Sequence, residues 1–247
     1  MTGSLAVPAV QARARLSGKP TLMAKHLQRD LDNLQQDILA LAGLVEGSIH
    51  KAIRALRERD VKVAKDVIAV DPQIDIEENH IEEECLKMLA LHQPVAIDLR
   101  RIASAMMINI DLERMGDLAE EIAERAVHLA GLPRLPIDDA NLQKMTDLTT
   151  MMVRQSLDAF VNLDARQAKL VCRLDDEVDR YNSEIIEELI RVMQSSSELV
   201  EPGLSMFSAI RHLERIADHA TNIAEDVVYL VEGEIIRHRP SAVDVND

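Results

Sequence analysis

The chain has 247 residues and a formal net charge of −15, and 47% of its residues are hydrophobic although only 2% are aromatic. Such a negative charge argues against a nucleic-acid partner, because binding to a polyanion depends on Lys and Arg side chains that neutralise phosphates. It suits cations or basic protein surfaces instead. With no Trp and only 8 Gly and 8 Pro, the core must consist of Leu, Ile, Val, Met and Ala, several of which favour helices. The composition therefore predicts an all-α protein.

The N-terminal part of the chain predicts a tail followed by one long and one short helix. Residues 1–20 show no periodicity and are expected to form a disordered tail. Between Leu27 and Leu56 the apolar residues recur every three or four positions, which predicts a helix of roughly 30 residues with one buried stripe. Asp60 is expected to cap a short helix, because an Asp side chain can accept hydrogen bonds from the first free N–H groups.

Two further helices are expected before the middle of the chain. Asp71-Pro72 predicts a helix start, since proline is well tolerated at the first helical position. Gln93-Pro94 is expected to end that helix near Leu91. A long helix then follows over about 95–130, and Gly131 marks its end.

The C-terminal part predicts a similar series. A helix is expected over about 138–162, and Asp164 is expected to cap the next segment. A separate helix over about 175–194 would follow, then a Ser-rich loop at 195–197. The last helix is expected from about 202 to 232.

The chain contains two related halves. The segment Asp111–Glu124 returns 101 residues later as His212–Glu225. Its repeated residues are Leu112, Glu113, Arg114, Asp117, Ala119, Ile122, Ala123 and Glu124, which recur as Leu213, Glu214, Arg215, Asp218, Ala220, Ile223, Ala224 and Glu225. Upstream the similarity continues with an offset of 104 residues, as in Asp60 and Asp164. A period of this length is too long for a solenoid repeat of roughly 20–50 residues, so we interpret the chain as two copies of one small domain.

The repeat and the helix pattern together predict the domain organisation. Short loops between long helices make neighbours in sequence antiparallel. We expect two tandem three-helix bundles, six helices in all, with residues 21–132 forming the first copy and residues 133–238 the second. Residues 239–247 are expected to be a second tail.

The sequence also predicts a cytoplasmic protein. Cys85 and Cys172 do not occupy equivalent positions in the two copies, which favours a reduced compartment over a disulfide framework. No segment approaches the roughly 20 apolar residues of a membrane span, and the N-terminus lacks the apolar core of a signal peptide. Direct membrane insertion is not expected, so contact with a membrane would go through a partner protein.

Two pairs of carboxylates stand out in the repeated segment. Glu113 and Asp117 are four residues apart and lie on one face of their helix, and Glu214 and Asp218 occupy the equivalent positions. Like charges at this spacing destabilise an isolated helix by about 0.2–0.5 kcal/mol. A pair kept in both copies therefore requires a compensating cation, either an arginine or a metal ion.

A second set of paired carboxylates lies on the preceding helix of each copy. These pairs are Asp71 with Asp75 and Asp175 with Asp179. If the two helices of a copy face each other, four carboxylates converge, and this all-oxygen set suits Mg, Mn, Ca or Fe. Further side chains on the same faces could act as outer ligands, namely Glu78 and Glu121 with their counterparts Asn182 and Asn222. The alternative is that Asp71 is only a helix cap and Glu113 only pairs with a basic side chain.

The histidines do not add to this site. His212 and His219 flank the second motif, but the first copy has Asp111 and Leu118 there, so we interpret both as helix-surface residues.

A redox di-iron enzyme is also disfavoured. Glu77-x-x-His80 fits half of a ferritin-like motif, in which two helices each supply Glu-x-x-His. The equivalent residues of the second copy are Tyr181 and Glu184. No nucleophile elbow, Gly-rich phosphate loop or zinc-spaced Cys/His cluster is present, and the sequence predicts that the protein is not an enzyme.

The repeated motif resembles the duplicated signature of the PhoU family. The similar segments are Leu112-Glu-Arg-Met-Gly-Asp117 and Leu213–Glu225, together with His92–Arg100 before the first motif. The resemblance covers about residues 24–238. It implies a pair of three-helix bundles related by a pseudo-two-fold axis.

The resemblance also implies a function. Members of this family act as cytoplasmic adaptors between the phosphate-specific ABC transporter and a membrane sensor histidine kinase, and they restrain phosphate uptake and the phosphate-starvation genes. A homodimer is expected.

Some members carry iron or zinc at these motifs, and Mg or Mn would also suit the ligands. On this chain the metal ligands would be Glu113, Asp117, Glu214 and Asp218, with Asp71, Asp75, Asp175 and Asp179 as co-ligands. Glu121 stands where Asn222 sits, so the first site is expected to be the more acidic.

Two rival functions are left open. One is a metal-storing or redox-active helical protein with carboxylate-bridged metals. The other is a purely structural scaffold without metal, for which Arg114 and Arg215 would neutralise the acids of the motifs.

Overall fold

The computed structural model describes residues 22–237, and this part of the chain is helical with no strand. The expected tails at 1–20 and 239–247 lie outside the described residues. None of the helices in the described range is long and apolar enough to cross a membrane. The elements are α1 (Leu22–Glu58), α2 (Val61–Ile68), α3 (Asp71–His92), α4 (Ile97–Ala130), α5 (Asp139–Asn162), α6 (Ala165–Ser195), the 3-10 turn η1 (Ser197–Leu199) and α7 (Val200–Glu232).

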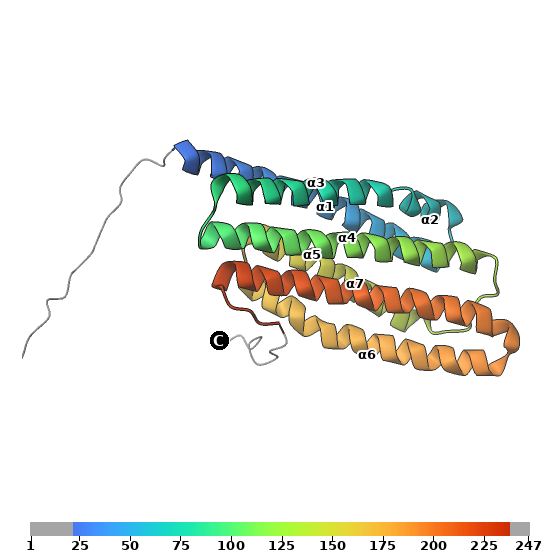
Figure 1. The fold of residues 1–247 in the computed structure, drawn as a ribbon. Coiled ribbons are helices and arrows are strands. Elements are labelled where there is room, and N and C mark those ends of the chain that lie inside the picture. The colour runs from blue at the N-terminus through green and yellow to red at the C-terminus, as the bar shows by residue number, and fades with distance from the viewer. Residues whose placement is uncertain (1–21, 238–247) are drawn as a thin grey trace, which may run out of the picture.

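The helices form two three-helix bundles that pack side by side (Figure 1). In the first bundle, α2 and α3 together make the middle helix between α1 and α4. The second bundle consists of α5, α6 and α7. The most extensive packing is between α4 and α7, which lie next to each other at the centre of the molecule (Figure 1). The expectation of an all-α protein made of two tandem three-helix bundles is therefore confirmed.

One continuous apolar core runs through both bundles, and α4 and α7 contribute the largest shares of buried residues. Alanines are frequent on these two helices, and Ala119, Ala123, Ala217, Ala220 and Ala224 have no exposed surface. Small side chains allow two helices to approach closely, since interaxial distance depends on the residues at the contact. The two central helices thus bring the acidic motifs of both copies to the middle of the molecule.

Aspartate caps fix the starts of α2 and α6. The Asp60 side chain accepts hydrogen bonds from the backbone N–H groups of Lys62 and Val63, at 2.9 and 3.1 Å. Asp164, its counterpart in the second copy, accepts from the N–H of Gln167 at 3.0 Å. Both predicted caps are therefore confirmed, and each satisfies donors that a helix start leaves free.

The middle helix of the second bundle differs from the prediction. A break before a helix at about 175 was expected, but α6 runs without interruption from Ala165 to Ser195. In the first copy the break between α2 and α3 is followed by Pro72 at the start of α3. The equivalent residue of the second copy is Asp176. Since Asp has the backbone N–H that proline lacks, the hydrogen-bond ladder continues through this position.

A pair of matching contacts relates the two bundles. Asn222 donates to Asp111 at 3.2 Å, and His212 Nδ1 lies 2.8 Å from Glu121 Oε2. Asp111 and His212 are equivalent positions, as are Glu121 and Asn222. The same two positions therefore meet twice across the interface between α4 and α7, which is the pattern of a self-complementary two-fold contact.

Candidate functional site

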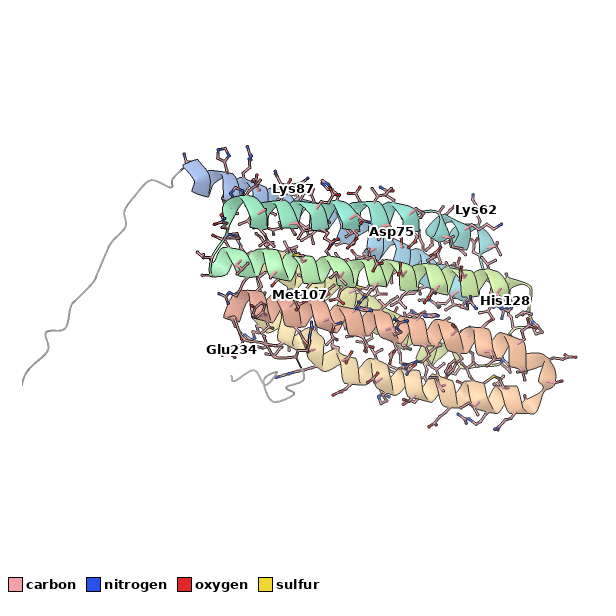
Figure 2. All side chains as sticks on the ribbon, viewed as in Figure 1. Lys62, Asp75, Lys87, Met107, His128 and Glu234 are labelled. Carbon is pink, nitrogen blue, oxygen red and sulfur yellow. The ribbon has the colours of Figure 1, made fainter. Side chains whose placement is uncertain are left out.

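The first acidic face lies between α3 and α4 and contains Asp71, Asp75, Glu113, Asp117 and Glu120. The packing of α3 on α4 brings one carboxylate oxygen each from Asp71, Asp75 and Asp117 within 4.8 Å of one another. Asp75 is labelled on α3 in Figure 2. Oxygen atoms this close together can all bind a single cation, whose bonds to carboxylate oxygen are about 2.0–2.6 Å long. Glu113 lies on the same face but outside this group of three.

The acids of this face raise one another's pKa. Burial and then the Asp75 carboxylate raise the pKa of Asp71. Burial and then Asp117 raise the pKa of Glu113. For Asp117 the causes of a raised pKa are burial, followed by the charges of Asp71 and Asp75. The face therefore holds more negative charge than it can easily accommodate, which is the condition under which a cation binds well.

Glu120 belongs to this face, and the sequence analysis did not identify it. Its carboxyl group lies beside Asp71, and burial and the Asp71 charge raise its pKa. The sequence did place Glu120 on this face, since it lies one helical turn after Asp117. The repeat does not point to Glu120, because the equivalent residue of the second copy is Thr221.

The residues of the first face fit a metal ion. The donors are carboxylate oxygens, which suit hard cations. One of them, Asp71 Oδ1, is buried and has no hydrogen-bond partner. A buried polar atom without a partner is unusual, and a bound cation would satisfy it.

The second acidic face, between α6 and α7, contains the equivalent residues Asp175, Asp179, Glu214 and Asp218 but is arranged differently. Asp175 accepts a hydrogen bond from Thr221 at 3.2 Å, and Glu214 accepts one from Arg211 at 2.8 Å. No group of three converging carboxylates forms here among the described residues. Among residues 22–237, three of the four expected carboxylates thus come within 4.8 Å of one another in the first face only. In the second face the charges of Glu214, Asp175 and Asp179 all raise the pKa of Asp218.

Burial also raises the pKa of carboxyl groups in the second face. Burial first, and then the charge of Glu214, raise the pKa of Asp218 to about 6. The pKa of Asp175 is also raised by burial, against the effect of its hydrogen bond with Thr221. Asp218 is thus able to take up a proton near pH 6.

The two histidines are not surface residues, contrary to the sequence interpretation. His219 is only 8% exposed, and its Nδ1 lies 2.7 Å from Asp111. His212 pairs with Glu121, and burial lowers the pKa of its imidazole while the Glu121 charge opposes that shift. Helical periodicity alone placed both on the outside, but the partner helix α4 covers them. Through these contacts with α4 they join the two bundles.

In the described part of the chain, the motif arginines form no ion pairs with the motif acids, and the charge of Arg114 has the smallest of the effects on the pKa of Glu113. Within residues 22–237, neither Arg114 nor Arg215 has an ion pair within 4.0 Å. Both line a cavity of about 510 Å³ between α4 and α7, together with Glu113, Asp117 and His219. The arginine pairing that a purely structural scaffold would need is thus not seen at these positions.

Comparison with known proteins agrees with the duplicated architecture. The PhoU domain model matches the chain twice, over residues 38–126 and 142–227. A phosphate-specific transport system accessory protein PhoU homolog from Pseudomonas putida is 40% identical over 87% of this chain and 84% of its own length. A homolog of the same name from Aquifex aeolicus is 40% identical over 86% of this chain and 96% of its own length.

Solved structures show the same similarity. The crystal structure of PhoU from Pseudomonas aeruginosa superposes with a TM-score of 0.82, at 39% identity, over 84% of this chain and 99% of that one. The phosphate transport system regulatory protein PhoU from Streptococcus pneumoniae gives a TM-score of 0.78 at 33% identity, over 85% and 98% of the two chains. Sequence, repeat and fold agree, and the chain belongs to the PhoU family.

Proposed function

We propose that this protein restrains phosphate uptake and the phosphate-starvation genes, as a cytoplasmic adaptor between the phosphate-specific ABC transporter and a sensor histidine kinase. Its relatives are named accessory proteins of the phosphate-specific transport system, which supports a role in regulating phosphate transport. The family consists of regulatory accessory proteins, and the chain is not an enzyme. The observation that carries the finer proposal is the first acidic face, where Asp71, Asp75 and Asp117 converge on a protein of strongly negative charge.

The first part of the proposal is that the acidic faces hold metal. Asp71, Asp75 and Asp117 would bind the ion in the first face, with Glu113 and Glu120 beside them. Iron or zinc is expected, and magnesium or manganese would suit the same oxygens. When bound, the ion would supply positive charge that neutralises the carboxylates.

Elemental analysis of the purified, unchelated protein tests this part. We expect near-stoichiometric metal in the unchanged protein and its loss in a variant with Glu113, Asp117, Glu214 and Asp218 replaced by alanine. A protein that contains no metal, and takes up none when iron, zinc or manganese is added, would contradict metal binding. An absorbance change of the iron-loaded protein on addition of peroxide or oxygen would favour the rival redox function.

The second part of the proposal is that the acidic faces dock basic elements of the transporter or the kinase. Complementary charge accelerates association and selects partners. Replacing the same four acids should weaken binding to the kinase while circular dichroism shows an unchanged helical content. Undiminished binding by the quadruple variant would contradict docking through these faces.

The regulatory role itself is testable in cells. Deleting the gene should raise phosphate uptake and the expression of phosphate-starvation genes in phosphate-rich medium, and the unchanged gene should restore both. A deletion strain with normal uptake and normal expression would overturn the proposed function. Sedimentation analysis of the purified protein tests the expected homodimer separately.

A further inference from the structure

A second kind of cavity, lined by arginines, differs in its chemistry from both acidic faces. It has a volume of about 610 Å³ and lies where the end of α1, the segment after α4 and the first half of α5 meet. Four arginines line it, namely Arg54, Arg57, Arg59 and Arg134. None of them belongs to the repeated motifs.

Arg59 builds one wall of this cavity. Its backbone is left-handed, with φ of 58°, and its guanidinium donates hydrogen bonds to the carbonyl oxygens of Leu129 (2.7 Å) and Pro133 (3.1 Å). A third bond goes to the carbonyl of Leu132. These bonds hold the segment after α4 against α1 and so place Arg134 near Arg59. Burial, and then the charge of Arg134, lower the pKa of Arg59.

The other three arginines of the cavity are available to a ligand. Arg54, Arg57 and Arg134 are exposed, and among the described residues none of them has a hydrogen bond or an ion pair within 4.0 Å. The acids in the lining are Glu58, Asp139 and Asp147, and of these Asp147 accepts a hydrogen bond from Gln143 at 2.6 Å. A chain with a net charge of −15 thus gathers three unpaired arginines, beside Arg59, at one cavity.

The second copy provides an internal comparison. At the same offset of 104 residues, Arg54, Arg57 and Arg59 are replaced by Asp158, Val161 and Leu163. Leu163 has the same left-handed backbone as Arg59, with φ of 52°, so the two positions are structurally equivalent.

The cavity beside Leu163 measures only about 40 Å³ and is lined mainly by apolar side chains, among them Phe160 and Leu230. The fold therefore does not require arginines or an open cavity at this place. The group of four arginines and the larger cavity occur beside Arg59, whereas a single arginine, Arg101, lines the cavity beside Leu163.

We propose that the arginine cavity binds a small molecule that carries a phosphate or polyphosphate group. Guanidinium groups donate pairs of parallel hydrogen bonds to phosphate oxygens and stay charged at all physiological pH values. A volume of about 610 Å³ falls within the roughly 300–1,000 Å³ of ordinary ligand pockets, so it accommodates a free phosphate ion or a molecule of nucleotide size. The proposal concerns binding alone and does not depend on the proposed regulatory function.

Isothermal titration calorimetry on the full chain tests the proposal with three probes: inorganic phosphate, ATP and citrate. The protein is first freed of metal by chelation and dialysis, because phosphate could otherwise bind to an ion on an acidic face. We expect saturable binding of phosphate or of ATP, and the tighter of the two identifies the source of the phosphate group. Tighter binding of citrate than of both, or binding of none of the three, would overturn the proposal.

A matched pair of variants locates the binding. R54D/R57V introduces the residues of the second copy into the cavity, and R166D/R191V makes the same charge change at two exposed arginines of α6. We expect the dissociation constant to rise at least about tenfold in R54D/R57V and to stay within about twofold of the unchanged protein in R166D/R191V. Equal affinities of R54D/R57V and the unchanged protein, with circular dichroism showing that both are folded, would overturn the assignment to this cavity.

Discussion

The two acidic faces descend from one motif but differ in charge and in the partners of their carboxylates. In the first face, Glu120 and Ile110 occupy the positions that Thr221 and Arg211 take in the second. Glu120 adds a carboxyl group beside Asp71, whereas Thr221 donates a hydrogen bond to the equivalent Asp175. A duplicated motif therefore does not imply duplicated chemistry, because residues outside the motif decide whether its acids face another acid, a hydroxyl group or an arginine.

The middle helices also differ between the copies, since only the first is interrupted. Interrupting the second one as well should have the largest effect on stability. Asp176→Pro introduces into α6 the proline that the first copy has at the start of α3. Because position 176 lies inside a continuous helix, we expect a loss of about 3 kcal/mol or more in the free energy of unfolding. Denaturant unfolding followed by circular dichroism measures this. Pro72→Ala is the control and should change stability by less than about 1 kcal/mol.

The two acidic faces should differ in their affinity for metal. The variant D71N/D75N/D117N removes the three converging carboxylates of the first face, and D175N/D179N/D218N removes the equivalents in the second. We expect the first variant to lose at least about tenfold in affinity for the tightest-bound ion and the second variant to lose less. Titration of the metal-free proteins with zinc or manganese measures both. A larger loss of affinity in D175N/D179N/D218N would show that the second face, and not the first, binds the ion more tightly.

The arginine of the second face should stabilise the metal-free protein. Glu214 is 8% exposed and pairs with Arg211, whose counterpart in the first copy is Ile110. Arg211→Ile leaves a largely buried carboxylate without its partner, so we expect a loss of about 1–3 kcal/mol at pH 7. Thermal unfolding measures it, and Arg215→Ile, at an exposed position without an ion pair, is the control. An unchanged melting temperature would mean that water satisfies Glu214.

A buried acid near the end of α7 should give the smallest effect, one that depends on pH. Burial raises the pKa of Asp226 to about 7 despite Arg237 at 3.3 Å, and the equivalent residue of the first copy is Arg125. An acid whose pKa is higher in the folded than in the unfolded protein lowers stability as the pH rises between the two values, here from about 4 to about 7.

The variant Asp226→Asn lacks this titration, so it should be more stable than the unchanged protein by about 1–2 kcal/mol at pH 8. The advantage should shrink steadily as the pH is lowered to 4. Melting temperatures of both proteins across this range measure the difference. A constant difference between pH 4 and pH 8 would show that Asp226 does not titrate there.

Much of the fold was predictable because it depends on local patterns. The apolar spacing from Leu27 to Leu56 predicted α1, and Asp60 and Asp164 predicted their caps. The prediction of a break in α6 was wrong because it was carried over from the first copy. In the first copy Pro72 lies at the break between α2 and α3, and α6 has no proline at the equivalent position. A break caused by one residue does not carry over to a copy that lacks it.

The sequence by itself determined most of the helices, the duplication, the family and the presence of paired carboxylates, because each depends on residue types and their spacing along the chain. Only the tertiary structure decided which side chains meet. It brings Asp71, Asp75 and Asp117 together and places Glu120 beside Asp71. It also buries His219 against Asp111 of the other bundle. It also gathered arginines of α1 with Arg134 around one cavity. These contacts join residues of different helices, and helical periodicity gives the face on which a residue lies but not the helix that packs against it.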